Sequence, residues 1–230
     1  MNICIIPARG GSKRIPRKNI KDFCGKPMLA RAIETAKHSQ LFEKIIVSTD
    51  DGEIAEIARQ HGAEVIDRPV ELANDYATTV AVIRHAVQDF AEKVNVCCLY
   101  PCTPLLTSNA LTESFDIWQK STSLYCFPVL EFESNILRSL KMDTENQLTS
   151  VFSQNEQVRT QDLPHAYYDA GQFYWGSRQA WLTEERIHSH ATGFVLPKYS
   201  VVDIDDESDW QFAEQLFGLK QLTLATSINL

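Results

Sequence analysis

The stretch Ile6-Pro-Ala-Arg-Gly-Gly-Ser-Lys-Arg-Ile-Pro-Arg-Lys-Asn19 follows directly on an apolar run and continues as a loop that is rich in glycine and cations. Gly10 and Gly11 let the backbone approach an anion, because no Cβ stands in the way and successive N–H groups can turn toward it. The full positive charges of the loop belong to Arg9, Lys13, Arg14, Arg17 and Lys18. This pattern predicts a polyphosphate-binding loop, and the alternative is a solvated basic loop.

The loop matches neither of two common phosphate-binding signatures. A Walker loop needs G-x-x-x-x-G-K-[ST], and a dinucleotide fold needs G-x-G-x-x-G. Gly10 and Gly11 are adjacent instead, and the later pair Gly25-Lys26 is followed by Pro27. The loop is therefore of a third kind, and the missing dinucleotide fingerprint disfavours a dehydrogenase.

Composition restricts the class of protein. The chain has 230 residues, 44% of them hydrophobic and 23% charged, which suits a globular protein with an ordinary core. The formal net charge is -8, which argues against binding to nucleic acid or to an anionic membrane. Exposed charges are screened beyond about 8 Å in physiological salt, so a local cluster of cations can still hold an anion on an acidic protein.

We expect a cytoplasmic protein without a membrane span. The first apolar run is short with no basic segment before it, and no run approaches the roughly 20 apolar residues of a spanning helix. The cysteines form no C-x-x-C pair, so buried thiols are expected rather than disulfides or zinc. His188 and His190 could bind a metal together, but their polar loop favours a surface position.

Strand-like and helix-like patterns alternate along the first part of the chain. Apolar runs predict strands at residues 2–6, 44–48, 63–66, 94–99 and 124–129, and helical stripes lie at 27–36, 54–62, 79–90 and 108–120. The alternation predicts an α/β fold with a mostly parallel sheet that is covered on both faces. Ligands in such folds bind beyond the carboxyl ends of the strands. We therefore expect one crevice, surrounded by the loops at 8–19, 49–51, 67–79 and 100–106.

The alternation stops between residues 131 and 164, where the chain is polar and lacks a clear helical period. Apolar anchors in this part favour a hairpin arm over a linker, and they are Leu137, Leu140, Leu148, Val151 and Phe152. We therefore divide the chain into an α/β core at residues 1–130, an arm at 131–170 and the remainder of the core at 171–230.

Asp203 and Asp205 flank Ile204 near the end of the apolar run 200–204, which we expect to be a strand. Residues two apart in a strand point to the same face, so both carboxylates can converge while Ile204 packs into the core. Two carboxylate ligands beside a polyphosphate suit Mg²⁺, because this ion keeps several water ligands and binds few protein carboxylates. The alternative is capping of the next helix, which also fits Asp206 and Asp209 but leaves Asp203 unexplained.

A family resemblance is carried by the loop of residues 8–19 together with Arg68-Pro-x-Glu-Leu-Ala73, Pro101-x-Thr-Pro104 and Asp203-Ile-Asp205-x-x-x-Asp209. In this order, and over nearly the whole chain, these motifs resemble the CMP-sialic acid synthetase family of sugar cytidylyltransferases. The resemblance implies a three-layer Rossmann-like nucleotidyltransferase fold with a mostly parallel sheet and a protruding dimerisation arm. It also implies a homodimer that transfers CMP from CTP to an acid sugar and releases pyrophosphate.

The resemblance implies roles for individual residues. Residues that would bind the nucleotide are Ala8, Arg9, Gly10, Gly11, Ser12, Lys13, Lys18, Asn19, Arg68, Asn74, Thr78 and Thr79, with Arg68 near the base. Asp203 and Asp205 match the Mg²⁺ ligands of the family. The residues expected to act in catalysis are Arg9, Lys13, Lys18, Asp203 and Asp205.

The sugar side departs from the sialic acid pattern. Synthetases for sialic acid usually have Gln-Pro-Thr-Ser-Pro-Leu-Arg where this chain has Tyr100-Pro-Cys-Thr-Pro-Leu-Leu106, which changes the hydrogen bonds that the pocket can offer. Residues 13–21 and 168–176 look most like the pseudaminic acid cytidylyltransferases, which activate a bacterial nonulosonic acid. Our candidates for sugar contacts are Tyr100, Thr103, Gln172, Phe173 and Tyr174, with Arg159 for the sugar carboxylate.

Other interpretations remain open at the level of the sequence. Tyr174 and its neighbours could pack a strand with aromatic rings, and Arg159 could be a surface arginine. The sugar could instead be N-acetylneuraminate, legionaminate or 3-deoxy-manno-octulosonate. The alternative that is not an enzyme is a module that binds a nucleotide without turning it over.

Overall fold

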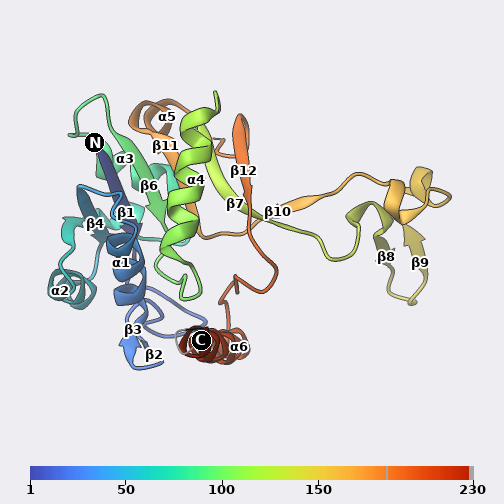
Figure 1. Ribbon diagram of the computed structural model, residues 1–230, viewed down its shortest axis with the longest axis horizontal. Coiled ribbons are helices and arrows are strands. Elements are labelled where there is room, and N and C mark those ends of the chain that lie inside the picture. The colour runs from blue at the N-terminus through green and yellow to red at the C-terminus, as the bar shows by residue number, and fades with distance from the viewer. Residues whose placement is uncertain (185, 228–230) are drawn as a thin grey trace.

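The computed structural model describes residues 1–184 and 186–227, and its centre is a mixed, mostly parallel sheet with the strand order β10-β7-β11-β6-β1-β4-β5 (Figure 1). β12 pairs with β7 beside this path. β1 lies parallel to β4 and β6, and β11 runs antiparallel between β6 and β7. The strands are β1 Asn2–Pro7, β4 Lys44–Thr49, β5 Glu64–Asp67, β6 Asn95–Leu99, β7 Tyr125–Glu131, β10 Tyr167–Asp169, β11 Phe173–Ser177 and β12 Ala191–Val195.

Helices cover both faces of the sheet, as the alternating pattern predicts. Successive side chains of β1 point to opposite faces, so Cys4 and Ile6 join one core cluster while Ile3 and Ile5 join the other. The first cluster packs against α1 Met28–His38, α2 Gly52–Gln60 and α4 Ser108–Lys120. The second packs against α3 Thr79–Val87 and α5 Arg178–Thr183. The layers are therefore helix, sheet and helix.

Side chains that cap the helices explain where most of them begin. The Asp51 carboxylate accepts hydrogen bonds from the backbone N–H groups of Glu53 and Ile54 at the start of α2. At the start of α3, α4 and α5, a side-chain hydroxyl group likewise accepts a hydrogen bond from a backbone N–H group. Pro27 differs from our expectation: it precedes α1 with extended backbone (ψ 137°) and is not its first residue. It ends the small hairpin of β2 Asp22–Phe23 and β3 Lys26–Pro27.

A third core cluster attaches the C-terminal helix α6 Glu207–Ser227 to the segment that follows the basic loop. Trp210 of α6 packs edge-on against Phe23, with ring centroids 5.3 Å apart. Ile204 and Ile15 are buried in the same cluster. This contact brings the residues just before α6 next to the loop at the opposite end of the sequence.

Residues 200–204 do not form the strand that we expected. They cross to α6 as irregular chain, in which the buried Ile204 is anchored in the third core cluster. Among the described residues, no strand pairs with them. Ile204 nevertheless points into the core and Asp203 and Asp205 point away from it. The side chains therefore alternate between the core and the solvent as we expected, although the segment is not a strand.

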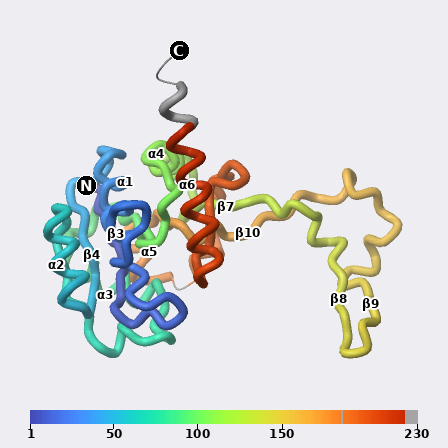
Figure 2. The backbone as a smooth tube through the Cα atoms, turned by 90° about the horizontal axis from the view of Figure 1, so that it is seen from below, coloured from blue at the N-terminus to red at the C-terminus, as the bar shows by residue number. Residues whose placement is uncertain are grey.

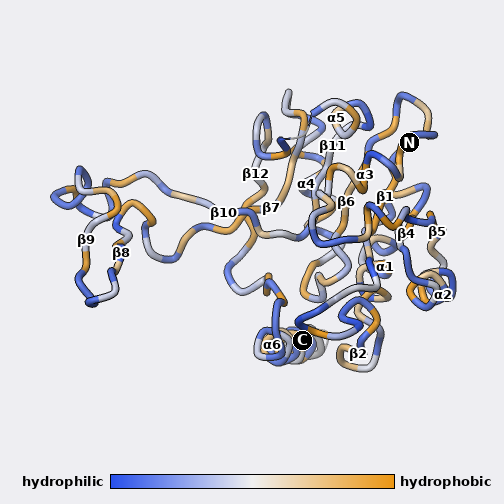
Figure 3. The backbone as a smooth tube through the Cα atoms, turned by 180° about the vertical axis from the view of Figure 1, so that it is seen from behind, coloured by the Kyte–Doolittle hydropathy of each residue, from blue (hydrophilic) through white to orange (hydrophobic). Residues whose placement is uncertain are grey.

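An arm leaves the body between β7 and β10 in both views (Figures 1 and 2). It carries the hairpin of β8 Leu140–Met142 and β9 Leu148–Ser150. Short 3₁₀ turns lie at η2 Ile136–Arg138, η3 Ser153–Asn155 and η4 Thr160–Asp162, and another, η1 Val70–Leu72, lies in the body. Figure 3 shows hydrophobic stretches along the arm. β10 belongs to the central sheet, so the protruding part ends before Tyr167.

In the part of the chain that the structure describes, no helix combines the length and the apolar character that crossing a bilayer requires.

Candidate active site

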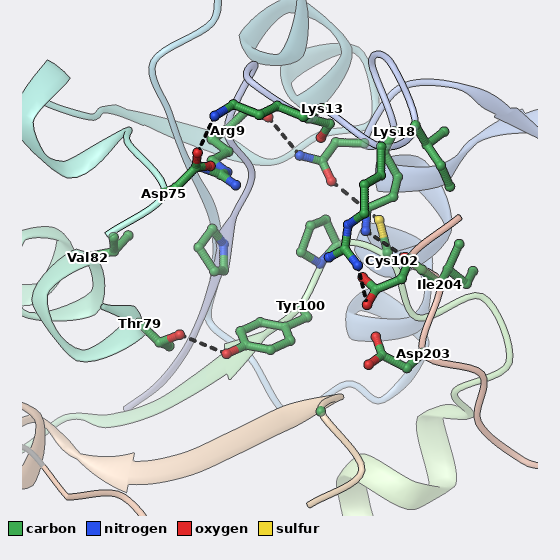
Figure 4. Close-up of a pocket in the computed structure, with 18 of the residues that line it drawn as sticks. Arg9, Lys13, Lys18, Asp75, Thr79, Val82, Tyr100, Cys102, Asp203 and Ile204 are labelled. Carbon is green, nitrogen blue, oxygen red and sulfur yellow. Dashed lines mark hydrogen bonds and ion pairs between the residues drawn. The ribbon is translucent and has the colours of Figure 1, made fainter. Parts of the chain in front are cut away.

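A cavity of about 580 Å³ lies at the end of the sheet where β1 and β6 finish (Figure 4). Four segments line it: the basic loop after β1, the segment between β5 and α3, the turn after β6, and residues 202–205 before α6. Gly171 and Gln172, just before β11, complete the wall. The predicted crevice thus exists, although the expected loop at 49–51 does not line it. Segments from the two ends of the sequence meet in it.

The basic loop presents most of its cations to this cavity. Arg9, Lys13, Arg14 and Lys18 line it, and Figure 4 shows Lys18 and Asp203 on its same side. The Lys18 ammonium donates a hydrogen bond to the Ile204 carbonyl oxygen at 2.7 Å. This bond ties the loop directly to the segment that carries the two aspartates.

The buried Asn19 holds the loop closed, because its amide donates to the Arg9 carbonyl oxygen at 2.9 Å. Cys102, which the sequence did not single out, donates its thiol to the other side of that amide, with Sγ 3.4 Å from Asn19 Oδ1. Gly10 N donates to an Asp50 carboxylate oxygen at 3.1 Å. A Cβ on Gly10 would come within 2.6 Å of Asp51 Oδ2, so glycine is required there by close approach.

Arg17 is the cation of the loop that does not line the cavity. Its backbone is left-handed (φ 57°), and its guanidinium binds Asp51 at 2.5 and 2.9 Å and Glu53 at 2.6 Å. The hydrogen bond from Arg17 lowers the pKa of Asp51 to about 2. Arg17 therefore fixes the loop to the start of α2 and is not available for a ligand.

Asp75 is a cavity residue that reasoning from the sequence missed. Its carboxylate pairs with Arg9 at 2.6 Å and with Lys13 at 2.5 Å. The hydrogen bonds from Lys13 and then Arg9 lower the pKa of Asp75. Two cations thus converge on one carboxylate, which is the geometry that binding of an oxyanion requires, and we call Arg9 and Lys13 the anion clamp.

Arg68 lies in the floor of the cavity with only 7% of its surface exposed. Its guanidinium donates to the Ser48 carbonyl oxygen at 2.5 Å and to the Ser48 hydroxyl at 3.2 Å. Burial lowers the pKa of Arg68 from its ordinary value. The hydrogen bonds hold the side chain rigidly at the carboxyl end of β4.

Asp203 and Asp205 both line the cavity, although the expected strand is missing. Asp205 pairs with Arg14 at 2.7 Å. Partial removal from solvent, and next the neighbouring Asp205 carboxylate, raise the pKa of Asp203. Capping of α6 falls to other residues: Asp206 accepts from the N–H groups of Ser208 and Asp209 at 2.8 and 3.1 Å.

The donor set fits a hard divalent cation. Within residues 1–184 and 186–227, no group of three histidine, cysteine, aspartate or glutamate side chains could enclose a metal. Two carboxylates beside a cluster of cations suit Mg²⁺, because this ion takes few protein ligands and completes its shell with water and phosphate oxygens. His188 and His190 lie elsewhere, outside the cavity wall.

The expected sugar-side residues divide into two groups. Tyr100 and Gln172 line the cavity, and the Tyr100 hydroxyl lies 2.7 Å from the Thr79 hydroxyl. Phe173 and Tyr174 do not line it: Phe173 is fully buried in one core cluster, and Tyr174 lies behind Tyr100 in the other. The reason is the alternation along β11, which turns both rings into the layers above and below the sheet.

The remaining expected site residues lie beside the cavity or away from it. Thr103 is buried and donates to the Tyr100 carbonyl oxygen at 3.1 Å, so it shapes the turn. Thr78 caps α3 through Ala81 N. Arg159 lies on the arm and pairs with Asp162 at 2.7 Å. Ser12 and Asn74 line the cavity, whereas Ala8, Gly10, Gly11 and Thr78 are not part of its wall.

Comparison with known proteins places this geometry in a family. The relatives include a pseudaminic acid cytidylyltransferase of Campylobacter jejuni, 43% identical over 222 residues that cover 94% of this chain and 96% of the relative. An N-acylneuraminate cytidylyltransferase of Escherichia coli is 29% identical and aligns over 92% of this chain and 51% of its own length.

A solved structure of CMP:2-keto-3-deoxy-manno-octonic acid synthetase in complex with CTP superposes with a TM-score of 0.69 at 15% identity, covering 95% of this chain and 99% of that one. This likeness shows the fold and confirms the predicted Rossmann-like nucleotidyltransferase architecture. The cytidylyltransferase family model matches residues 3–227. The chain therefore belongs to the cytidylyltransferase family.

Proposed function

We propose that the protein is a pseudaminic acid cytidylyltransferase, which transfers CMP from CTP to pseudaminic acid and releases pyrophosphate. The observation that carries the proposal is the single cavity in which four cations of one loop face two carboxylates from the other end of the chain. A relative that is 43% identical over almost its whole length has this activity in its name. CTP and the acid sugar are the partners, and we infer that the reaction takes place in the cytoplasm.

The triphosphate would occupy the cavity beside the basic loop. The anomeric hydroxyl of the sugar would attack the α-phosphorus and release its proton to solvent. The bond between the α-phosphorus and its bridging oxygen to the β-phosphate would break, and pyrophosphate would leave. Lys13, Lys18 and Arg9 would offset the charge that grows on pyrophosphate. Asp75 would keep Arg9 and Lys13 in place, and the N–H groups that do not bind Asp75 would bind the phosphate oxygens, because a guanidinium and an ammonium each have more donors than this carboxylate occupies.

Asp203 and Asp205 would hold Mg²⁺ beside the phosphates. When bound, the ion would supply positive charge to the phosphate oxygens and orient them for attack. The chain prepares this position itself: Lys18 binds the carbonyl oxygen of Ile204 at 2.7 Å and so fixes the backbone between the two aspartates. Arg14 pairs with Asp205 Oδ2 at 2.7 Å, which leaves Oδ1 of the same carboxylate to hold the ion.

The sugar would bind against Tyr100, Gln172 and Thr79. Burial raises the pKa of Tyr100 to about 12, so the phenol stays neutral at physiological pH and acts as a hydrogen-bond donor or acceptor, not as a base. Gln172 is 3% exposed, and its amide donates to the Ala170 carbonyl oxygen at 3.0 Å, which leaves its oxygen as an acceptor. A neutral wall of this kind suits a sugar with acylamino groups and few hydroxyls.

The arm would join two subunits into a homodimer. Its exposed side chains include Leu140, Met142 and Leu148, which are 58%, 64% and 59% exposed. Covering them removes apolar surface from water, and a second copy of the chain offers a matching arm. We propose that Arg159 on this arm reaches the partner's cavity and binds the sugar carboxylate there through two parallel hydrogen bonds.

Complementation between subunits tests that arrangement. Arg159→Ala and Asp203→Asn variants should each be nearly inactive alone. If each site combines residues of both subunits, random mixing makes half of the dimers hybrids with one intact site, so about a quarter of all sites recover. Mixtures that stay inactive while native mass spectrometry shows hybrid dimers would refute the contribution of Arg159.

A panel assay tests the function itself. Pyrophosphate release should be measured with CTP, Mg²⁺ and each of pseudaminic acid, legionaminic acid, N-acetylneuraminic acid and 3-deoxy-manno-octulosonic acid. We expect the highest kcat/KM with pseudaminic acid. A higher value with another acid sugar would reassign the substrate, and binding of CTP without release of pyrophosphate would indicate a nucleotide-binding module.

A further inference from the structure

We propose that Asp169, which is not part of the cavity wall, is a positioning residue for the acid sugar: its two carboxylate oxygens hold the two protein segments that carry Tyr100 and Gln172. This inference rests on the proposed function and adds a residue to it. Asp169 ends β10 and is partly buried, with 23% of its side chain exposed.

One carboxylate oxygen supports the tyrosine side of the wall. Asp169 Oδ2 accepts a hydrogen bond from the Tyr174 hydroxyl at 2.9 Å. The Tyr174 ring packs edge-on against the Tyr100 ring, with centroids 5.5 Å apart and planes at 62°. The Tyr100 hydroxyl in turn meets the Thr79 hydroxyl at 2.7 Å in the cavity. The position of the Tyr100 phenol therefore depends on Asp169 through one intervening ring.

The other oxygen supports the glutamine side. Asp169 Oδ1 accepts a hydrogen bond from Gly171 N at 2.8 Å. Gly171 has a left-handed backbone (φ 61°), which needs such a support, and it precedes Gln172 in the cavity wall. Gln172 also accepts a hydrogen bond from Tyr100 N at its carbonyl oxygen, at 2.9 Å. The two supported segments thus meet again at the cavity.

A histidine holds the carboxylate itself from the outer side. His188 Nε2 lies 2.8 Å from Asp169 Oδ2, and the His188 ring packs edge-on against Phe127 at 5.2 Å. Phe127 also contacts the Tyr174 ring, at 5.6 Å. Burial raises the pKa of Tyr174, so its hydroxyl remains protonated and donates to Asp169. The carboxylate therefore has a fixed partner on each side.

The consequence is specific to the sugar. The cations proposed to bind phosphate lie on the basic loop, and within the described residues Asp169 forms its hydrogen bonds with Gly171, Tyr174 and His188 and none with that loop. Loss of the carboxylate should loosen Tyr100 and Gln172 and leave the anion clamp of Arg9 and Lys13 in place. An increase of about tenfold in the KM for the sugar corresponds to about 1.4 kcal/mol, which is the contribution expected of a single hydrogen bond to the sugar.

The test compares three variants. Tyr174→Phe keeps the ring and removes the donor, and Asp169→Ala removes both acceptors. Asp169→Asn retains an oxygen for Gly171 N and should rescue part of the loss. The matched control is Tyr125→Phe, which removes another buried phenol that donates to the Glu184 carbonyl oxygen at 3.0 Å without supporting the cavity.

We expect Tyr174→Phe and Asp169→Ala to raise the KM for the acid sugar by about tenfold and to leave the calorimetric Kd for CTP within about twofold. Tyr125→Phe should lower the melting temperature without changing the KM for the sugar. The inference fails if both test variants keep the wild-type KM for the sugar, or if their affinity for CTP falls by the same factor. If the wild type prefers another acid sugar, the proposed substrate is wrong, and the same comparison with that sugar still decides the role of Asp169.

Discussion

The Asp51 side chain makes two interactions, a helix cap and an ion pair with the basic loop, and the substitution Asp51→Asn separates them. Asp51 caps α2 through Glu53 N and Ile54 N, both at 3.0 Å, and it binds the guanidinium of Arg17. Asparagine caps a helix about as well as aspartate, so the substitution should remove the ion pair and keep the cap. Asp51→Ala should remove both.

The magnitude follows from the pKa of Asp51. Its value of about 2, against an ordinary 3.8, corresponds to roughly 2 kcal/mol at about 1.4 kcal/mol per unit. Arg17 is 38% exposed, so screening by water reduces the contribution to about 1 kcal/mol. For a chain of this size, Asp51→Asn should lower the melting temperature by about 2–4 °C, and Asp51→Ala, with a further loss of about 1 kcal/mol, by about 4–8 °C.

The dependence on pH distinguishes the ion pair from packing. Because folding depresses the pKa of Asp51, its contribution is present above about pH 4 and is lost as the pH falls through about 2. The free energies of unfolding that urea denaturation gives for the wild type and for Asp51→Asn should therefore differ at pH 7 and become equal toward pH 2. The control is Thr107→Ala, which removes the cap of α4 and no ion pair. Its free energy of unfolding should differ from that of the wild type by the same amount at every pH. A difference between wild type and Asp51→Asn that is unchanged at low pH would refute the reasoning.

Further changes test the cavity and the core. Lys18→Met should weaken CTP binding at least about tenfold, because a hydrogen bond to a charged group contributes about 1.5–3 kcal/mol; unchanged affinity by calorimetry would contradict this. Asp203→Asn and Asp205→Asn should each lower kcat about a hundredfold or more and raise the concentration of Mg²⁺ that activity requires. The control Asp206→Asn keeps its capping role and should retain activity. Near wild-type turnover in the first two variants would contradict the metal assignment. Gly176→Ala should destabilise the fold by about 1–3 kcal/mol in urea, because its Cβ would come within 2.8 Å of a buried tyrosine ring; a wild-type transition would show that the ring can move.

Most regular elements could be predicted from the sequence because their signals are local. The helix at 108–120 has the bounds expected from its stripe, and the other strands and helices expected before residue 130 lie within a few residues of theirs. The elements β10, α5 and β12 were not expected. The loop of residues 8–19 was recognisable because its glycines and cations are adjacent in sequence. The strand expected at 200–204 was wrong, since an apolar run of that length also occurs where one side chain anchors an irregular segment.

The residues missed at the site share a different feature. Asp75 and Asp169 lie in polar or aromatic stretches without a motif, and their importance comes from partners distant in the chain, such as Arg9 for Asp75 and His188 for Asp169. Phe173 and Tyr174 stood next to Gln172 in the sequence, but only the orientation of β11 decided which of the three lines the cavity.

The sequence by itself determined the alternating elements, the cluster of glycines and cations in the basic loop and the pair of carboxylates near the C-terminus, because these depend on neighbouring residues. Only the tertiary structure decided that loop and carboxylates share one cavity. The cause is a long-range packing contact: α6 docks on the hairpin after the loop through Trp210 and Phe23, and Lys18 then binds the backbone between Asp203 and Asp205. Burial of apolar surface between segments so distant in the chain leaves no local pattern to read.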